Sequence, residues 1–283
     1  MKYQVVHNNV FSFDQIVESC ELLSKLSLVE NDWQRISFRQ LQVHPFGSIK
    51  NESLDAFGNK LTNILFKKQI HSLRISSIHN VITNQIEFDY SKSCIIQDAI
   101  NLKQMDLKNY QEDSLLAIVN DSIKSYAMQS LTQNQTVYKV ALDLTHRIYQ
   151  DFKFDPYIST IQSTTIDCLN NRAGVCQDFS HFAVACLKSI GLTARYISGY
   201  VDTKLDDNKI YIPGKDVSHA WFGVYDPNLG WLEFDPTNNM LVEDRHIRMA
   251  FGKDYNDVCP LKGKVDSKGG NSLKVSVDVS KID

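Results

Sequence analysis

The amino-acid sequence predicts an α+β protein in which a buried helix packs on an antiparallel sheet, behind a β-rich N-terminal domain. Three observations support this prediction. Residues up to about 90 contain alternating apolar and polar runs that are typical of strands. Residues 176–190 repeat apolar side chains at helical spacing, and residues 218–235 have the composition of two strands joined by a tight turn. We therefore expect a β-sandwich-like accessory domain at 1–110 and an α+β domain at 111–283.

Strands are predicted for four segments of the N-terminal domain. The alternation in the first of them shifts phase near Gln40, which indicates a bulge, and residues 14–28 fit either a helix or a strand. No cluster of titratable side chains in this domain points to chemistry. The four predicted strands are residues 34–43, 61–66, 72–76 and 85–90.

The second domain follows a weakly patterned connection at 91–112. Helices are predicted at 115–128 and from 137 onward, the latter with Thr136 as its N-cap, and Thr164 or Thr165 caps a short third helix. A strand is expected at 194–201, a mobile polar loop at 202–215 and a terminal strand at 272–279.

Composition narrows the class of protein and its partners. The chain has 283 residues, 43% hydrophobic residues and a net charge of −3, the balance of an ordinary globular protein. This charge gives no reason to expect nucleic acid or an anionic membrane as a partner. Its six cysteines include no C-x-x-C pair, so neither a zinc ribbon nor a thioredoxin-like site is expected. We expect no metal, and the chemistry predicted below requires no cofactor. Without an apolar leader or membrane span, we expect a cytoplasmic protein.

Cys176 is the candidate nucleophile. It follows a turn-forming polar run that ends at Gly174, and it precedes the apolar face of the predicted helix, which stops at Gly191. Free N–H groups and the positive end of the helix dipole stabilise a thiolate at such a place. Cys186, by contrast, falls on the apolar face and is assigned to packing.

His219 and Asp235 are the candidate base and orienting carboxylate. They bracket the turn of the predicted hairpin, so antiparallel pairing brings them together, and a carboxylate beside an imidazole fixes its tautomer. The alternatives are a strand-end histidine without a role and an aspartate that only begins a turn before Pro236. His181 is the local rival base, five residues after Cys176, but it points away from the Cys176 face.

Three further residues have less certain roles. Asp178 is expected to brace the start of the helix, with Arg172 or Arg195 as a partner for its charge. Trp221 and Tyr200 are the candidate substrate-binding residues, with core packing as an equal alternative.

Several motifs resemble the bacterial transglutaminase-like proteins, which belong to the papain-like group of cysteine enzymes. These are RAGVCQDF at 172–179, SHAW at 218–221 and GWLEFDPTN at 230–238, with DAFGN at 55–59 and GKDYNDV at 252–258. The resemblance covers nearly the whole chain and implies a papain-like core with Cys176, His219 and Asp235 as a triad. Gly223 departs from the family, where relatives often carry an acidic residue.

The resemblance and the residues together imply a cysteine hydrolase that cleaves peptide or side-chain amide bonds through an acyl-thioester, with a protein or peptide as substrate. Transfer of the acyl group to an amine uses the same three residues and is the main alternative. An inactive binding module of the same fold is the other. The sequence leaves the substrate and the oligomeric state open.

Overall fold

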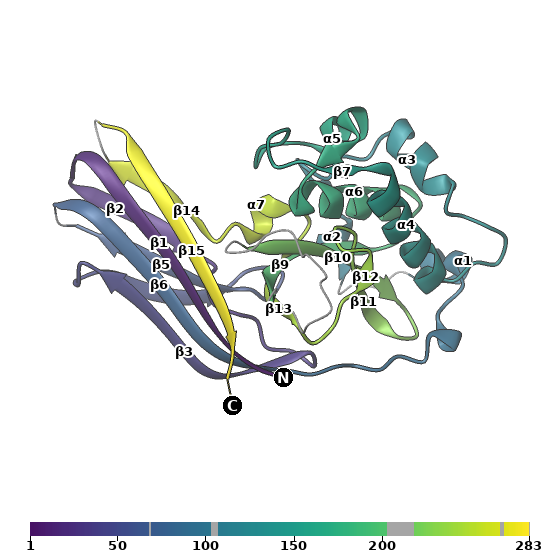
Figure 1. Cartoon of the computed structure of the whole chain (residues 1–283), viewed down its shortest axis with the longest axis horizontal. Helices are drawn as coiled ribbons and strands as arrows, with labels where there is room; N and C mark the ends of the chain where they lie inside the picture. Colours follow the sequence, from purple (N-terminus) through teal and green to yellow (C-terminus); the bar gives the residue numbers. More distant parts are fainter. Residues whose placement is uncertain (68, 103–106, 203–217, 267–268, 283) are drawn as a thin grey trace.

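A computed structural model describes residues 1–67, 69–102, 107–202, 218–266 and 269–282. Long strands form a β-sandwich at one end of the molecule, helices lie at the other end, and a third sheet lies between them (Figure 1). The predicted α+β fold, a transglutaminase-like core after an N-terminal all-β region, is confirmed. The loop expected at 202–215 lies, apart from Asp202, outside the described residues.

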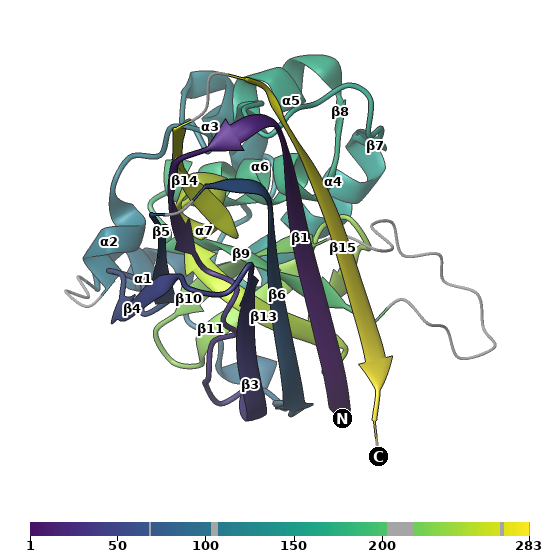
Figure 2. The same cartoon turned by 90° about the vertical axis from the view of Figure 1, so that its left-hand side faces the viewer.

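The sandwich is built from both ends of the chain. Strand β15 (Asn271–Lys281) pairs antiparallel with β1 (Lys2–Val17), so the two termini lie together (Figure 2). The first sheet has the order β15-β1-β6-β3 and the second has the order β14-β2-β5-β4. The other strands are β6 (Ile70–Thr83), β3 (Gln34–His44), β14 (Leu261–Asp266), β2 (Ser19–Ser24), β5 (Lys60–Phe66) and β4 (Ile49–Leu54).

The last two strands therefore belong to the N-terminal sheets, although the predicted second domain at 111–283 includes them. The division into domains at 110 itself stays a prediction. The terminal strand was predicted from its alternation, but alternation does not specify which strand it pairs with.

The central sheet carries the candidate site. Its five strands are antiparallel in the order β12-β11-β10-β9-β13. Helix α6 (Cys176–Ser189) packs on one face of this sheet, and the sandwich core contacts the other face through Tyr200, Ile247 and Met249. The strands are β12 (Met240–Leu241), β11 (Gly230–Asp235), β10 (His219–Asp226), β9 (Ala194–Val201) and β13 (His246–Gly252).

The helical layer follows the predicted caps. The Thr136 hydroxyl accepts a hydrogen bond from the Lys139 N–H, and Thr164 forms a capping box with Asp167. The remaining elements are η1 (Tyr90–Lys92), α1 (Ile96–Asn101), α2 (Lys108–Gln111), α3 (Asp121–Met128), α4 (Val137–Asp151), α5 (Thr165–Asn171), α7 (Tyr255–Val258) and the parallel pair β7 (Lys153–Phe154) and β8 (Ala173–Gly174).

Three local predictions need correction. The bulge in β3 lies between Ile36 and Phe38, earlier than predicted. Residues 84–89 are not a strand; their alternation arises because Phe88 and Tyr90 pack against the helical core without a neighbouring strand. The first long helix begins at Asp121 rather than 115, where Asn120 supplies the cap, and the connection at 91–112 contains short helices.

Two amide side chains fasten the sandwich to the outer edge of β13. Gln34 donates to the Arg248 carbonyl at 2.7 Å and accepts from the Arg248 N–H at 2.8 Å. Asn59, in the DAFGN turn, makes the same pair of bonds to the backbone of Phe251, at 2.7 and 2.8 Å. An edge strand has backbone N–H and C=O groups that no neighbouring strand bonds. On β13, Gln34 and Asn59 bond four of these groups, so the N-terminal region stabilises this edge of the central sheet.

Buried histidines make the fold sensitive to acid. Burial lowers the pKa of His7 and of His79 to about 4, although a hydrogen bond with Asn9 partly opposes this at His7, whereas unfolding restores the ordinary value of 6.5. Between these pH values the unfolded chain binds protons that the folded chain does not, so the free energy of unfolding falls as pH falls. Each of the two histidines contributes up to about 1.4 kcal/mol per pH unit to this fall.

We expect His79→Asn to flatten this pH dependence. Asparagine does not titrate and retains a polar group near Ser77, which lies 3.0 Å from the ring Nδ1. The measurement is the free energy of urea unfolding at several pH values between 7 and 4.5, with exposed His71→Asn as the control. A slope equal to that of the wild type in His79→Asn would contradict this account.

Candidate functional site

Cys176 occupies the first position of helix α6, as the sequence predicts. The turn before it is tight: a Cβ on Gly174 would lie 2.7 Å from both Cβ and Oδ2 of Asp178, so only glycine fits there. Asp178 Oδ2 in turn accepts a hydrogen bond from the Val175 N–H at 2.8 Å. These contacts fix the backbone on both sides of Cys176, a residue that is only partly buried.

Asp178 braces the helix as expected, but the predicted arginine partner is wrong. Arg195 bonds instead to Glu233, and the Arg172 guanidinium lies over the ring of Phe152. Burial raises the pKa of Asp178, and the hydrogen bond from the Val175 N–H partly opposes this rise.

The hairpin of β10 and β11 brings His219 and Asp235 together. Phe222 pairs with Phe234 and Asp226 with Gly230, so His219 and Asp235 lie just beyond the paired part of the hairpin. There His219 Nε2 lies 2.7 Å from Asp235 Oδ2, and both side chains are almost completely buried. The residues that the sequence placed on opposite strands therefore form a hydrogen-bonded pair.

The pair is polarised by its surroundings. Burial alone lowers the pKa of His219, but the charge and hydrogen bond of Asp235, together with the Cys176 sulfur, outweigh burial and raise it to about 10. Burial alone raises the pKa of Asp235, but His219 and His246 hold it well below its ordinary value. The arrangement favours an imidazolium beside a carboxylate.

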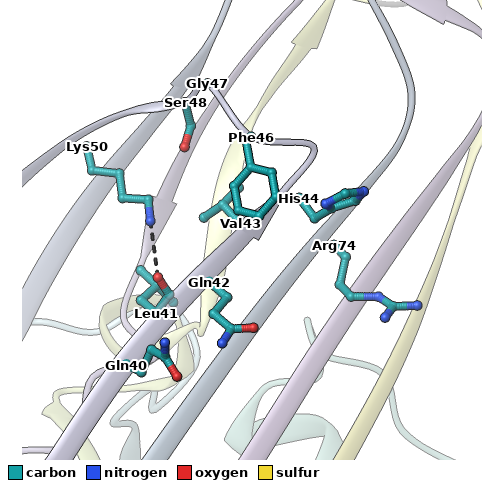
Figure 3. Close-up of a pocket in the computed structure, with 10 residues that line it drawn as sticks. All are labelled: Gln40, Leu41, Gln42, Val43, His44, Phe46, Gly47, Ser48, Lys50 and Arg74. Atoms are coloured by element: carbon teal, nitrogen blue, oxygen red, sulfur yellow. Dashed lines mark hydrogen bonds between the residues drawn. The ribbon is translucent and has the colours of Figure 1, made fainter.

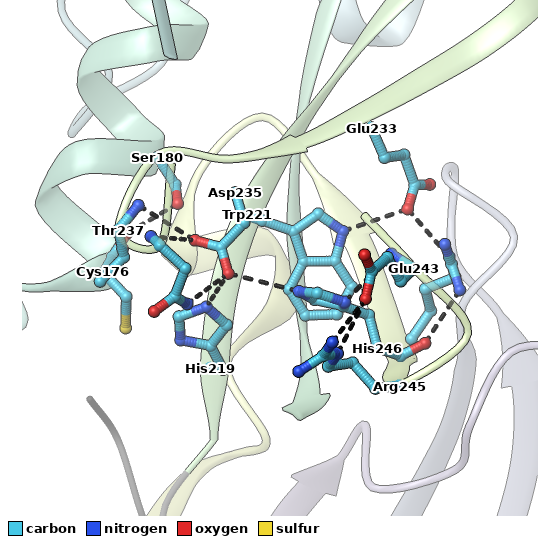
Figure 4. Close-up of polar contacts among 12 residues, drawn as sticks. Cys176, Ser180, His219, Trp221, Glu233, Asp235, Thr237, Glu243, Arg245 and His246 are labelled. Carbon is cyan, nitrogen blue, oxygen red and sulfur yellow. Dashed lines mark hydrogen bonds and ion pairs between the residues drawn. The ribbon is translucent and has the colours of Figure 1, made fainter. Parts of the chain in front are cut away.

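The Cys176 sulfur lies beside the His219 ring (Figure 4). Because Nε2 faces Asp235, Nδ1 is the ring nitrogen left for the thiol proton, and it has no other hydrogen-bond partner among the described residues. His219 Nδ1 does not form an aligned hydrogen bond with the sulfur. In cysteine enzymes without bound substrate, the contact between nucleophile and base is often loose in this way. The three side chains can therefore support attack by sulfur on a carbonyl carbon.

His246 also contacts this site, which sequence reasoning missed. It begins β13, and its Nε2 lies 3.3 Å from Asp235 Oδ2. No local sequence motif identifies His246 as part of the site. The sequence indicates only a histidine at the start of a predominantly apolar strand. His181, the rival base, accepts a hydrogen bond from the Tyr255 N–H at 2.9 Å and is fully buried, so it is already used in packing α7.

Trp221 and Tyr200 lie in the core. Trp221 is 0% exposed and donates to Glu233 at 3.1 Å, while Tyr200 is 1% exposed and contacts His7 Nδ1 at 2.7 Å. This burial favours core packing, the equal alternative for both residues, and their role in substrate binding stays a prediction.

Glu233 links the site to a buried charge cluster. Its carboxylate bonds to Arg195 at 2.7 Å and to Arg248 at 2.9 Å, and both arginines stack on aromatic rings. Gly223 pairs with both Arg195 and Glu233 across the sheet, so the departure from the family lies in this cluster and not beside Cys176.

In the described part of the chain, no group of three histidine, cysteine, aspartate or glutamate residues is arranged to hold a metal ion. No helix there is long and apolar enough to cross a membrane. A cavity of about 640 Å³ lies beside β3, lined by His44, Phe46, Lys50 and Arg74 among others (Figure 3). Cys176, His219 and Asp235 do not line it.

Two family models match the sequence. Residues 124–236 match the transglutaminase-like superfamily, and residues 3–81 match the bacterial transglutaminase-like N-terminal region. The first match contains Cys176, His219 and Asp235, and the second covers much of the sandwich.

Individual relatives agree with these matches. An uncharacterized protein of Mycobacterium tuberculosis is 31% identical over 98% of this chain and 92% of its own length. A protein-glutamine gamma-glutamyltransferase of Pseudomonas aeruginosa is 28% identical over a region that covers 35% of this chain and 16% of the Pseudomonas protein. The crystal structure of a "putative cysteine protease" from Cytophaga hutchinsonii superposes with a TM-score of 0.81 at 20% identity, covering 100% of this chain and 91% of that one.

Proposed function

Because the chain belongs to the bacterial transglutaminase-like proteins, we propose that it is a cysteine hydrolase of peptide or side-chain amide bonds. Cys176 is the nucleophile, His219 the base and Asp235 the orienting carboxylate. The observation that carries the proposal is the buried 2.7 Å contact between His219 and Asp235, with Cys176 beside the ring at the start of α6.

The reaction proceeds in two steps. The proton of the Cys176 thiol lies on His219 Nδ1, which gives the imidazolium that Asp235 favours, and the thiolate attacks the carbonyl carbon of the amide. His219 then gives that proton to the departing nitrogen, so the C–N bond breaks and an acyl-thioester forms on Cys176. Water attacks the thioester, its proton passes to His219, and the carboxylic acid leaves as the sulfur recovers a proton.

The substrate class follows from the same chemistry. We propose a protein or peptide whose backbone or side-chain carboxamide reaches the partly buried sulfur. Removal of ammonia or of an attached sugar amine from a side-chain amide would use the same acyl intermediate. Water reaches a partly exposed thioester, which favours hydrolysis.

Acyl transfer to a primary amine is the second candidate. The name of the Pseudomonas relative, a gamma-glutamyltransferase, favours it for that protein, and the same thioester accepts an amine in place of water. The two outcomes differ only in which acceptor reaches the thioester first.

We expect hydrolysis products to exceed amine adducts. The test incubates the protein with a pool of glutamine- and asparagine-containing peptides, with and without a small primary amine, and reads the products by mass spectrometry. Amine incorporation equal to or above hydrolysis at modest amine concentration would make the protein a transferase. No product at all would favour a binding module.

A further inference from the structure

The carboxylate of Asp235 has a second histidine neighbour that the proposed triad does not use. His246 Nε2 and His219 Nε2 lie 3.3 and 2.7 Å from the same oxygen, Oδ2 (Figure 4). His246 and Asp235 are both 0% exposed, so solvent does not compete for this contact.

The surroundings of His246 identify its tautomer. The Glu243 N–H points at His246 Nδ1, 3.3 Å away, and a backbone N–H can only donate. Nδ1 is therefore the acceptor, and the proton of the neutral ring lies on Nε2, which faces Asp235.

The ring stays neutral despite its acidic neighbour. Burial lowers the pKa of His246; Asp235 opposes this, while the positive charges of His219 and Arg248 add to it. Glu243, whose backbone contacts the ring, directs its carboxylate to Arg245 instead, 2.7 Å away. A neutral His246 can donate a hydrogen bond to the Asp235 carboxylate. It adds no second positive charge there, so His219 remains the cation that pairs with Asp235.

We propose that His246 is a positioning residue whose Nε2–H fixes the Asp235 carboxylate in the orientation that His219 requires; the inference rests on the proposed function. Asp235 Oδ1 accepts from the N–H groups of Thr237 and Asn238, at 3.0 and 3.2 Å. Oδ2 accepts from Asn238 Nδ2 at 2.6 Å and from His246. Donors on both oxygens prevent the carboxylate from rotating away from His219.

The sandwich takes part in this positioning through β13. His246 lies at the start of β13, and Gln34 holds both backbone groups of Arg248, two residues further along. Arg248 Nη1 also bonds the carbonyl of His246 at 2.9 Å. The N-terminal region therefore supports the strand that carries the second histidine.

The test compares His246→Leu with His246→Gln, whose amide can place a donor near the position of the imidazole Nε2. For the best peptide found, we expect His246→Leu to lower kcat by about 10- to 100-fold with KM little changed, because a misoriented group slows chemistry more than binding. His246→Gln should recover most of kcat, and exposed His71→Leu should match the wild type. Thermal unfolding of each variant checks that it is folded.

Nitrogen NMR of histidine-labelled wild-type protein provides a readout that does not depend on turnover. A neutral His246 with its proton on Nε2 at pH 7 supports the proposal. A proton on Nδ1, a charged ring, or a His246→Gln variant as slow as His246→Leu would overturn it. If the wild type cleaves no peptide, the proposed function fails, and the NMR spectrum still decides the state of His246.

Discussion

Replacing Cys176 with alanine is expected to abolish amide turnover, lowering kcat/KM by about three orders of magnitude or more. The reason is chemical: His219 and Asp235 remain paired, but no atom is left to form the acyl-thioester. The measurement is product formation from the peptide pool, read by mass spectrometry in wild type and variant.

Cys259→Ala is the matched control for this experiment. Cys259 is also partly buried and free, but it contacts Tyr255 and Leu261 rather than a histidine. We expect it to retain the activity of the wild type. Turnover in Cys176→Ala above a tenth of the wild-type value, or equal losses in both variants, would exclude Cys176 as the nucleophile.

Glu233→Gln is expected to destabilise the fold by about 3–5 kcal/mol, because it leaves two buried guanidinium groups without a counter-charge. Arg195 and Arg248 both bond to this carboxylate, and the Glu233 side chain has no exposed surface. Burial alone raises the pKa of Glu233, but the two arginines outweigh burial and lower it, so the group is charged at neutral pH. The measurement is the free energy of unfolding in urea.

The control is Glu243→Gln, which breaks a pair of similar geometry at the surface. Glu243 and Arg245 lie 2.7 Å apart but are 41% and 32% exposed, so solvent screens their attraction. We expect this change to cost less than about 1 kcal/mol. Equal costs for the two substitutions would mean that the buried cluster does not stabilise the central sheet.

Local sequence patterns predicted the parts of the candidate site that a single helix or hairpin forms. The polar turn before Cys176, the apolar helix after it and the hairpin around Asp226 are each specified by neighbouring residues. The sequence therefore predicted where Cys176 lies in the helix and that His219 and Asp235 form a pair. The spacing of apolar residues also gave the caps at Thr136 and Thr164.

The parts that depend on distant contacts were not predictable in this way. The alternation of β15 gives a strand, but its pairing with β1 joins opposite ends of the chain. His246 reaches Asp235 only because β13 pairs with β9 across the sheet. Trp221 lies in a motif that resembles an active site, yet it is buried in an apolar cluster with Ile197 and Phe251.

The central claim is that Cys176 and His219 act as a pair. The most direct test measures the alkylation rate of each cysteine, resolved by site, as a function of pH in wild type and in His219→Ala. We expect Cys176 to react faster than the other five cysteines and to lose this advantage in His219→Ala. A Cys176 that is inert, or that reacts like the other thiols in both proteins, would contradict the account and favour a binding module.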